Sequence, residues 1–400
     1  MHFRIVAALA LALAGRWGTW PVVWAETPPE SASSASRVGS GFTYQHDQVP
    51  RVPWSVQIAR VNRSRTNFFL ETTLAGNTSI GIATVSEQMS HWPRARGRPM
   101  AAINGDYFVR RGSFEGDPEG LQIAHGEVIS APNSKSCFWV DADNGLHLSN
   151  VVSQFSVTLP GGEILPLGLN EELSSDQAVL YSAAVGGSTR TWKCSEYILE
   201  RDSTQPWLPL RIGETYTARI REVRKAGNTL LTPDTLVLSL PRALEKRLRS
   251  AGLATGAVVQ LALRTLPDLK GARLALGGGP ALLRDGQRTD FRSERVRHPR
   301  TAIGWNRDDF FLVQVDGRQP GLSVGMTLTE LADYLQKLGC TEALNLDGGG
   351  SSTLWADGQV MNNPSEGSER PTGNALVIVR TMEARPARAN SPPTSAPQEK

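Results

Sequence analysis

The sequence predicts an α+β protein: a twisted mixed β-sheet with few helices, a β-α-β crossover near the C-terminus and a β-rich insertion. Three observations carry this prediction. The 400 residues include 38 glycines and 25 prolines, which favours many turns. Most of the middle consists of short apolar runs between turn residues, as strands do. The last third contains a strand, a helix and a strand in succession. With 40% hydrophobic residues the chain has enough apolar side chains for a sizeable core.

The N-terminus has the pattern of an export signal over residues 1–25. His2 and Arg4 precede an apolar run over residues 5–14, and small residues near Ala25 are typical of a cleavage site. The run has about half of the roughly 20 residues that a membrane-spanning helix needs. We therefore expect an exported protein, periplasmic or extracellular, with no stable membrane insertion after cleavage. An uncleaved anchor is the alternative.

Composition divides the rest of the chain. Residues 26–45 are rich in Pro, Ser and Ala and are expected to be a flexible linker, and residues 383–400 share this bias and are expected to be a disordered tail. One folded domain is expected over residues 46–382. Within it, residues 212–266 hold two or three strands around a helical segment, which predicts a small β-rich insertion.

Individual elements follow from periodicity. Strands are expected at residues 55–61, 68–73, 101–103, 155–159, 216–223, 258–263, 273–276, 302–305, 310–315, 343–346, 353–355 and 374–380. A helix opens at Thr327, with Glu330 three residues on as in a capping box, and Gly339 ends it. Because this helix lies between two strands, a right-handed β-α-β crossover is predicted.

Both strands of this crossover end in an aspartate. Asp316 and Asp347 are each followed by glycine. If the strands are neighbours, or one apart, the two carboxylates face one cleft at the edge where such sheets bind ligands. We therefore predict that Asp316 and Asp347 are catalytic. The alternative is that each Asp-Gly pair only forms a turn.

Polar and glycine residues around the second aspartate predict a substrate-binding site. Three glycines in succession allow close backbone approach to a ligand, and their amides can form an anion-binding nest. The run lacks the lysine of a nucleotide-binding P-loop, and a tight structural turn is the alternative. Arginines suit a phosphate because the guanidinium pairs with it bidentately. The predicted substrate-binding residues are Asn104, Asp106, Arg300, Arg318, Gly348, Gly349, Gly350, Ser351, Ser352 and Arg370.

Charge and cysteine counts exclude several classes. The 42 basic and 39 acidic residues give a net charge of +3, so no nucleic-acid partner is expected. Cys137 and Cys194 could form a disulfide in an exported protein. Neither the three cysteines nor the six histidines have zinc-site spacing. No metal or other cofactor is predicted.

Taken together, these motifs resemble the phosphodiester glycosidase family of exported proteins, over roughly residues 101–379. The resemblance is carried by Ala102-Ile-Asn-Gly-Asp-Tyr-Phe, Gly277-Gly-Gly-Pro, Arg300-Thr-Ala-Ile-Gly, Asp316-Gly-Arg, Ser323-x-Gly-Met-Thr-Leu, Asn345-Leu-Asp-Gly-Gly-Gly-Ser-Ser-Thr and Arg370-Pro-x-Gly-Asn-Ala-Leu. At Asp106-Tyr107 the sequence departs from the family, which more often has a small residue and Phe there.

The resemblance implies a hydrolase that cleaves the bond between a sugar C1 and a phosphodiester oxygen. It implies a sugar-phosphate or polysaccharide substrate, and we expect the protein to act on envelope or extracellular polysaccharide. Such a reaction needs carboxylates at C1 and cations at the phosphate, which agrees with the residues selected above. Two other hypotheses stay open: a metal-assisted phosphodiesterase, and a polysaccharide-binding protein without activity.

Overall fold

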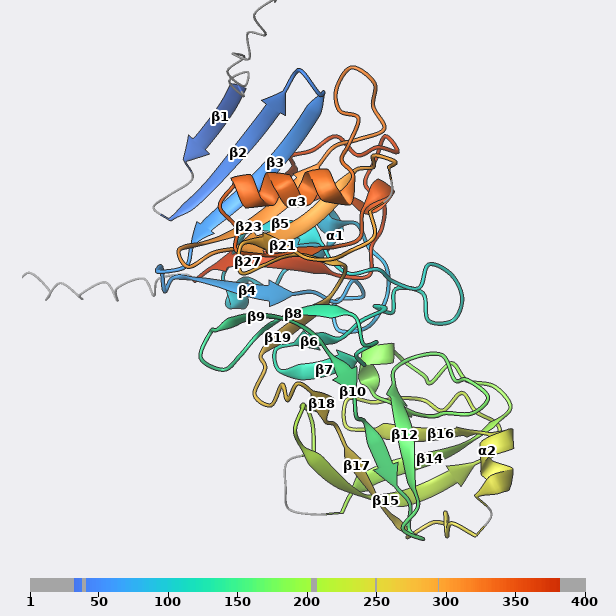
Figure 1. The fold of residues 1–400 in the computed structure, drawn as a ribbon. Helices are drawn as coiled ribbons and strands as arrows, with labels where there is room; N and C mark the ends of the chain where they lie inside the picture. Colours follow the sequence, from blue (N-terminus) through green and yellow to red (C-terminus); the bar gives the residue numbers. More distant parts are fainter. Residues whose placement is uncertain (1–31, 38–40, 203–206, 249, 294, 382–400) are drawn as a thin grey trace, which may run out of the picture. The chain divides into compact units, whose positions relative to one another are not determined.

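The described part of the fold is mostly β, with three larger sheets, one two-stranded pair and a closed barrel (Figure 1). The computed structural model describes residues 32–37, 41–202, 207–248, 250–293 and 295–381. The predicted signal peptide and C-terminal tail lie outside these residues. Among the described helices, none has the length and apolar character needed to cross a membrane.

The largest sheet has eight strands, and every neighbouring pair is antiparallel. In spatial order they are β1 (Ala32–Arg37), β2 (Phe42–Val49), β3 (Trp54–Asn62), β23 (Asp309–Val315), β22 (Arg300–Trp305), β24 (Glu342–Asn345), β20 (Ala281–Arg284) and β21 (Gln287–Arg288). Thus part of the segment expected to be a linker, residues 32–37 and 42–45, is strand. β2 pairs with β3 along its whole length.

Two five-stranded sheets accompany it. The first has the order β26 (Gln359–Val360), β25 (Leu354–Ala356), β5 (Arg98–Asn104), β27 (Ala375–Arg380) and β4 (Phe68–Thr72). The second has the order β7 (Glu127–Ser130), β6 (Gln122–Ala124), β19 (Leu274–Gly277), β8 (Ser136–Val140) and β9 (Leu146–Asn150). A short pair joins β10 (Val152–Ser153) to β18 (Thr265–Leu266).

Helices cover the outer faces of two of these sheets. Along β23, Phe310 and Leu312 pack in one apolar cluster with residues of β5, whereas Phe311 and Val313 pack in another with α3 (Leu328–Lys337). This two-residue alternation is what a strand buried on both faces requires. Helix α1 (Val85–Ser90) packs in the same way against β5 and β27. The described part also contains α2 (Arg242–Arg247) and the 3-10 turns η1 (Arg94–Arg96), η2 (Ala183–Val185) and η3 (Gly349–Ser351).

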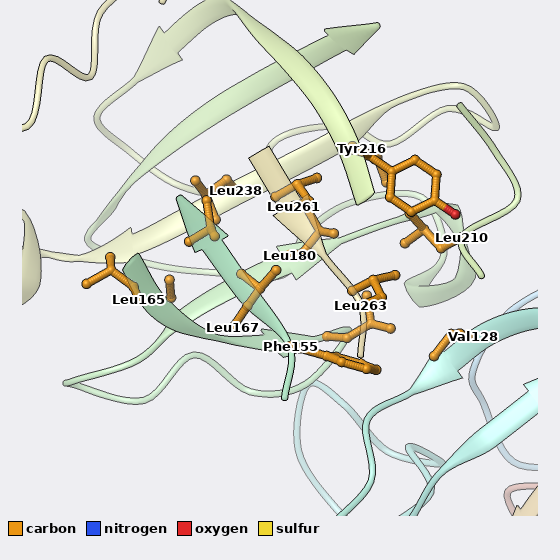
Figure 2. Packing of buried hydrophobic residues seen from close by; sticks show 14 of the residues in the cluster. Val128, Phe155, Leu165, Leu167, Leu180, Leu210, Tyr216, Leu238, Leu261 and Leu263 are labelled. Carbon is orange, nitrogen blue, oxygen red and sulfur yellow. The ribbon is translucent and has the colours of Figure 1, made fainter. Parts of the chain in front are cut away.

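The β-rich insertion is a closed seven-stranded barrel and is larger than predicted. Its order is β11 (Ser156–Thr158), β12 (Ile164–Leu169), β13 (Ala178–Tyr181), β16 (Leu236–Pro241), β14 (Cys194–Arg201), β15 (Thr215–Arg224) and β17 (Val258–Ala262). Figure 2 shows Leu167, Leu180, Leu238 and Leu261 from four of these strands among the residues of one apolar cluster. The predicted range 212–266 misses β11 to β14, because their hydrophobic pattern does not differ from that of the flanking sheets.

The predicted right-handed β-α-β crossover is not confirmed, because β22 lies between the two strands that α3 connects. The capping box at Thr327 and Glu330 is confirmed, and α3 connects β23 to β24. The two strands run in the same direction, since both are antiparallel to β22, which lies between them. The α+β prediction therefore holds only in part: the described chain is mainly antiparallel β. Cys137, Cys194 and Cys340 are buried and free, so the disulfide between Cys137 and Cys194 is absent.

Candidate active site

The ends of three segments from different sheets meet beside Asp347. The Asp347 amide donates to the carbonyl of Gly105, just past β5, at 3.0 Å. The Gly279 amide, just past β19, donates to the carbonyl of Asn345 in β24 at 2.8 Å. Polar residues that are far apart in the sequence therefore lie at one junction.

Asn104 holds this junction together. Its Nδ2 donates to the Asp347 carbonyl at 2.7 Å, and its Oδ1 accepts from Thr301 Oγ1 at 2.8 Å and from the Thr353 amide at 3.0 Å. The residue is 1% exposed. These contacts make Asn104 a positioning residue for Asp347, while its predicted contact with substrate stays a prediction.

The carboxylate of Asp347 is buried and incompletely paired. Its Oδ2 has no hydrogen-bond partner among the described residues. Burial raises its pKa; a hydrogen bond from Ser351 and the positive charge of Arg110 act in the opposite direction. A buried acceptor without a partner is costly and uncommon in folded proteins. This oxygen is therefore a strong candidate for contact with a ligand.

Asn345 presents a second such oxygen. Its Oδ1 is buried and has no hydrogen-bond partner in the described part of the chain, while its Nδ2 donates to Tyr107 Oη at 3.0 Å and to the Gly279 carbonyl at 2.8 Å. Burial and the nearby charge of Asp347 raise the pKa of Tyr107, so its phenol stays protonated at neutral pH. Asn345 thus adds a second buried acceptor, next to the Tyr107 phenol.

Asp106 is a second buried carboxyl close to Asp347. Its two oxygens accept from the amides of Tyr107 and Gly120, each at 2.8 Å. Burial, aided by the charges of Glu119 and Asp347, raises the pKa of Asp106 to about 7. A carboxyl in this range can exchange a proton near neutral pH.

A cavity of about 520 Å³ opens beside Asp106 and Tyr107. Its wall includes Gly278, Gly279 and Pro280. A Cβ atom on Gly277 would lie 2.2 Å from Asp106 Oδ2, and one on Gly278 would lie 2.7 Å from the Asn345 carbonyl. The triple glycine is thus explained by close packing against these two residues.

The predicted arginines gather around the second glycine run. A guanidinium nitrogen of Arg318 lies 3.2 Å from the place of a Cβ on Gly349, and Arg370 lies against Gly350. Arg370 also donates to Ser351 Oγ at 3.4 Å and forms an ion pair with Glu366.

Arg300 approaches the same site from β22. Its Nε donates to the Met326 carbonyl at 2.8 Å, and its charge lowers the otherwise raised pKa of Tyr107. The grouping of Arg300, Arg318 and Arg370 matches the predicted phosphate site, although their role in binding stays a prediction.

The glycine run itself differs from the predicted nest of free amides. The amides of Gly349, Ser351 and Ser352 donate to the carbonyls of Pro299, Gly348 and Gly349. The chain satisfies these donors because residues 349–351 form a 3-10 turn, with Gly349 at φ +63°. The small glycines let Arg318 and Arg370 approach the backbone closely. The adjacent Ser352 Oγ is buried and has no hydrogen-bond partner among the described residues.

Asp316 has quite different surroundings. It is 1% exposed, and its carboxylate accepts from Ser55 Oγ at 2.8 Å, from Gln314 Nε2 at 3.2 Å and from the Asn363 amide at 3.0 Å. Because β22 separates β23 from β24, the two strand ends are about 10 Å apart. A catalytic role for Asp316 stays a prediction, and these contacts favour a role in anchoring the loop at Asn363.

Sequence reasoning did not select several residues at the junction. Tyr107 and Asn345 lie inside motifs quoted above, next to selected residues, but nothing in the sequence shows that their side chains meet. Arg110 and Glu366 lie in loops and carry no signal beyond their charge.

Comparison with known proteins identifies a family that part of the chain matches. Residues 218–379 match the model of the phosphodiester glycosidase family, a range that includes Asp347, the glycine run and the three arginines. Over this range, about two fifths of the chain, the sequence matches the phosphodiester glycosidase family. Asn104, Asp106 and Tyr107 lie outside the matched range.

Two curated relatives share short segments. The SPbeta prophage-derived uncharacterized protein YomE of Bacillus subtilis (strain 168) is 37% identical over 115 residues, covering 27% of this chain and 18% of that protein. The mouse (Mus musculus) N-acetylglucosamine-1-phosphodiester alpha-N-acetylglucosaminidase is 36% identical over 72 residues, covering 18% of this chain and 14% of that enzyme. The chain thus aligns with less than a fifth of the length of either relative.

The fold recurs in a solved structure. A hypothetical protein from Synechocystis superposes with a TM-score of 0.71 at 20% identity, covering 88% of this chain and 64% of that one. At this identity the similarity concerns the fold alone.

Proposed function

We propose that the protein hydrolyses a sugar-1-phosphodiester at the C1–O bond and releases a free sugar and a phosphomonoester. The observation that carries the proposal is the buried, unpartnered Oδ2 of Asp347 beside a loop lined with arginines. The match of residues 218–379 to the phosphodiester glycosidase family supports this reaction class. The predicted export and the use of envelope or extracellular polysaccharide are part of the same proposal.

The chemistry places different demands on the two ends of the scissile bond. The leaving group is a phosphomonoester, whose second pKa is about 6, so it departs without a strong general acid. The sugar passes through a transition state with positive charge near C1. A carboxylate at C1 and cations at the phosphate therefore supply most of the stabilisation that is needed.

Asp347 meets the first demand. Its free Oδ2 lies against C1 and stabilises the positive charge there. Asp106, whose pKa is about 7, takes a proton from the water that supplies the new oxygen on C1. The C1–O bond breaks, its electron pair leaves with the phosphate, and the water oxygen remains on the sugar.

The arginines meet the second demand. Arg370 and Arg318 flank Gly350 and Gly349, so a phosphate over the glycine run receives hydrogen bonds from both sides. Arg300 contributes further positive charge. Glu366 pairs with Arg370 in the structure and limits how strongly this arginine holds the phosphate.

A donor screen tests the proposal. A panel of sugar-1-phosphodiesters, N-acetylglucosamine donors included, is incubated with the wild type and with Asp347→Asn, and free reducing sugar is measured. Asp333→Asn, an exposed carboxylate on α3, is the matched control. We expect one or more donors to release sugar with the wild type and the control, and none with Asp347→Asn. Saccharide binding without release from any donor would instead indicate a binding protein.

A further inference from the structure

A second cavity adjoins the one beside Asp106. It has a volume of about 360 Å³, and its wall includes Asp117, Glu171, Gln177 and Ser130. Glu119 and Asn133 line both cavities, so the two are neighbours. Cavities of this size are in the range that holds small ligands.

One hairpin carries residues of both cavities. The Glu119 amide donates to the Tyr107 carbonyl at 2.8 Å, and the Val109 amide donates to the Asp117 carbonyl at 2.9 Å. Tyr107 therefore faces the first cavity from one arm, while Asp117 and Glu119 come from the other. The barrel completes the second cavity with Glu171 and Gln177, from the connection between β12 and β13.

Asp117 is a buried polar group without its full set of partners. It is 6% exposed, it lines the second cavity, and its Oδ1 has no hydrogen-bond partner among the described residues. Burial and the nearby charge of Glu171 raise its pKa well above the ordinary value. Burial also raises the pKa of Glu171, which accepts from Gln177 Nε2 at 3.3 Å.

The residue types in the wall of the second cavity limit which ligands can bind there. Three carboxyl groups line this cavity, and of the residues described there none is Lys, Arg or His. Lys135 pairs with Glu119 at 3.2 Å but lines the first cavity only. Because the described wall holds no cation, a phosphate or other anion is disfavoured here, whereas a sugar hydroxyl, which both donates and accepts hydrogen bonds, would satisfy Asp117.

Resting on the proposed function, we infer that the second cavity is a subsite for an additional sugar unit, uncharged or amine-bearing, of an oligosaccharide donor. The phosphate lies at the arginines, the sugar that carries C1 lies in the first cavity, and the next sugar donates hydrogen bonds to Asp117 and Glu171. The preferred substrate is then a saccharide chain rather than a single phosphorylated sugar.

Three donors test this inference. They are the methyl phosphodiesters of N-acetylglucosamine, of the corresponding N-acetylated disaccharide, and of a disaccharide whose second sugar has a free amine. Affinity is measured on Asp347→Asn, where turnover is removed, and hydrolysis is measured on the wild type. We expect both disaccharides to bind at least tenfold more tightly than the monosaccharide, with the free amine showing whether charge adds to the hydroxyl contacts.

Variants in the second cavity assign the effect. Asp117→Asn and Glu171→Gln should each remove most of the disaccharide advantage while monosaccharide affinity stays unchanged. Glu163→Gln, an exposed residue on the barrel, is the matched control and should retain the advantage. The melting temperature of each variant shows whether it is folded. If one variant misfolds, the other still tests the subsite.

The outcomes separate the two proposals. Equal affinity for all three donors, no binding of any donor, or an advantage that survives both variants would overturn the subsite. Tighter disaccharide binding that depends on Asp117, without sugar release by the wild type, would support the subsite and overturn the proposed function.

Discussion

Asp316 and Asp347 have similar positions in the sequence but different surroundings in the structure. Each follows a strand of the same sheet and precedes a glycine. The carboxylate of Asp316 accepts three hydrogen bonds from Ser55, Gln314 and Asn363, whereas Oδ2 of Asp347 has no partner among the residues that the structure describes. Burial raises the pKa of both carboxyls.

This difference supports the proposal that Asp316 anchors a loop and that Asp347 is catalytic. A carboxylate whose lone pairs are already used holds neighbouring loops in place, and a reacting group would have to displace those donors. A buried oxygen left without a partner costs stability and is tolerated where a ligand will contact it. Hydrogen-bond satisfaction thus distinguishes these residues, which burial and chain position do not.

Replacing Asp347 tests the catalytic side of the comparison and should give the largest effect. Asp347→Asn removes the negative charge beside C1, so we expect kcat to fall by about 10³-fold. The melting temperature should stay near that of the wild type, since Oδ2 makes no hydrogen bond that the amide would break. Steady-state sugar release and calorimetry measure the two quantities. A variant with more than a tenth of the wild-type kcat would contradict the assignment.

Replacing Asp316 tests the anchoring side. Asp316→Asn sets an amide NH₂ against groups that donate to the carboxylate, so we expect a loss of about 1–3 kcal/mol in the free energy of unfolding. Once folded, the variant should keep kcat within a few-fold of the wild type. Urea unfolding and sugar release distinguish this from catalysis: a stable but inactive variant would place Asp316 in the chemistry.

Arg370 tests whether the glycine run of the Asp347 loop holds a phosphate. Arg370→Lys retains the charge but loses the planar fork, so KM should rise about tenfold, with a smaller change in kcat. Glu366→Gln removes the carboxylate that competes with phosphate and should lower KM. If both variants shift KM in the same direction, the competition between Glu366 and phosphate is disproved.

The pH dependence of activity and stability tests the proposed role of Asp106 as the base. Because its pKa is about 7, the ionised base forms as pH rises, and kcat/KM should increase through pH 7 in the wild type and lose this limb in Asp106→Asn. The contribution of Asp106 to the free energy of unfolding should change in the opposite direction with pH. The folded state keeps the proton where the unfolded chain, with an ordinary pKa of 3.8, has lost it, so the contribution of Asp106 falls as pH rises from about 4 to about 7. Unfolding at pH 5 and pH 8 measures this change, and an equal response in Asp106→Asn would assign it to another group.

Local signals predicted the elements of this fold better than their assembly. Periodicity located β3, β15, β22 and β23, and the capping box located the start of α3, because these signals involve only neighbouring residues. The barrel was underestimated because closure depends on pairing between β11 and β17, about 100 residues apart.

The candidate site shows the same limit. Glycine and arginine patterns identified the loop at Gly348–Ser352 and the arginines around it. The separation of Asp316 from Asp347 depends on β22 lying between their strands, and the approach of Asp106 depends on how two sheets meet; the sequence specifies neither. The unpartnered oxygens of Asp347 and Asn345 are likewise visible only in three dimensions.

Hydrolysis in oxygen-18 water tests the central claim most directly. Water attacks the sugar carbon in the proposed reaction, so the label should appear in the released sugar and be absent from the phosphomonoester, with or without a chelator. Label in the phosphate would show attack at phosphorus and contradict the assignment of Asp347 to the anomeric carbon.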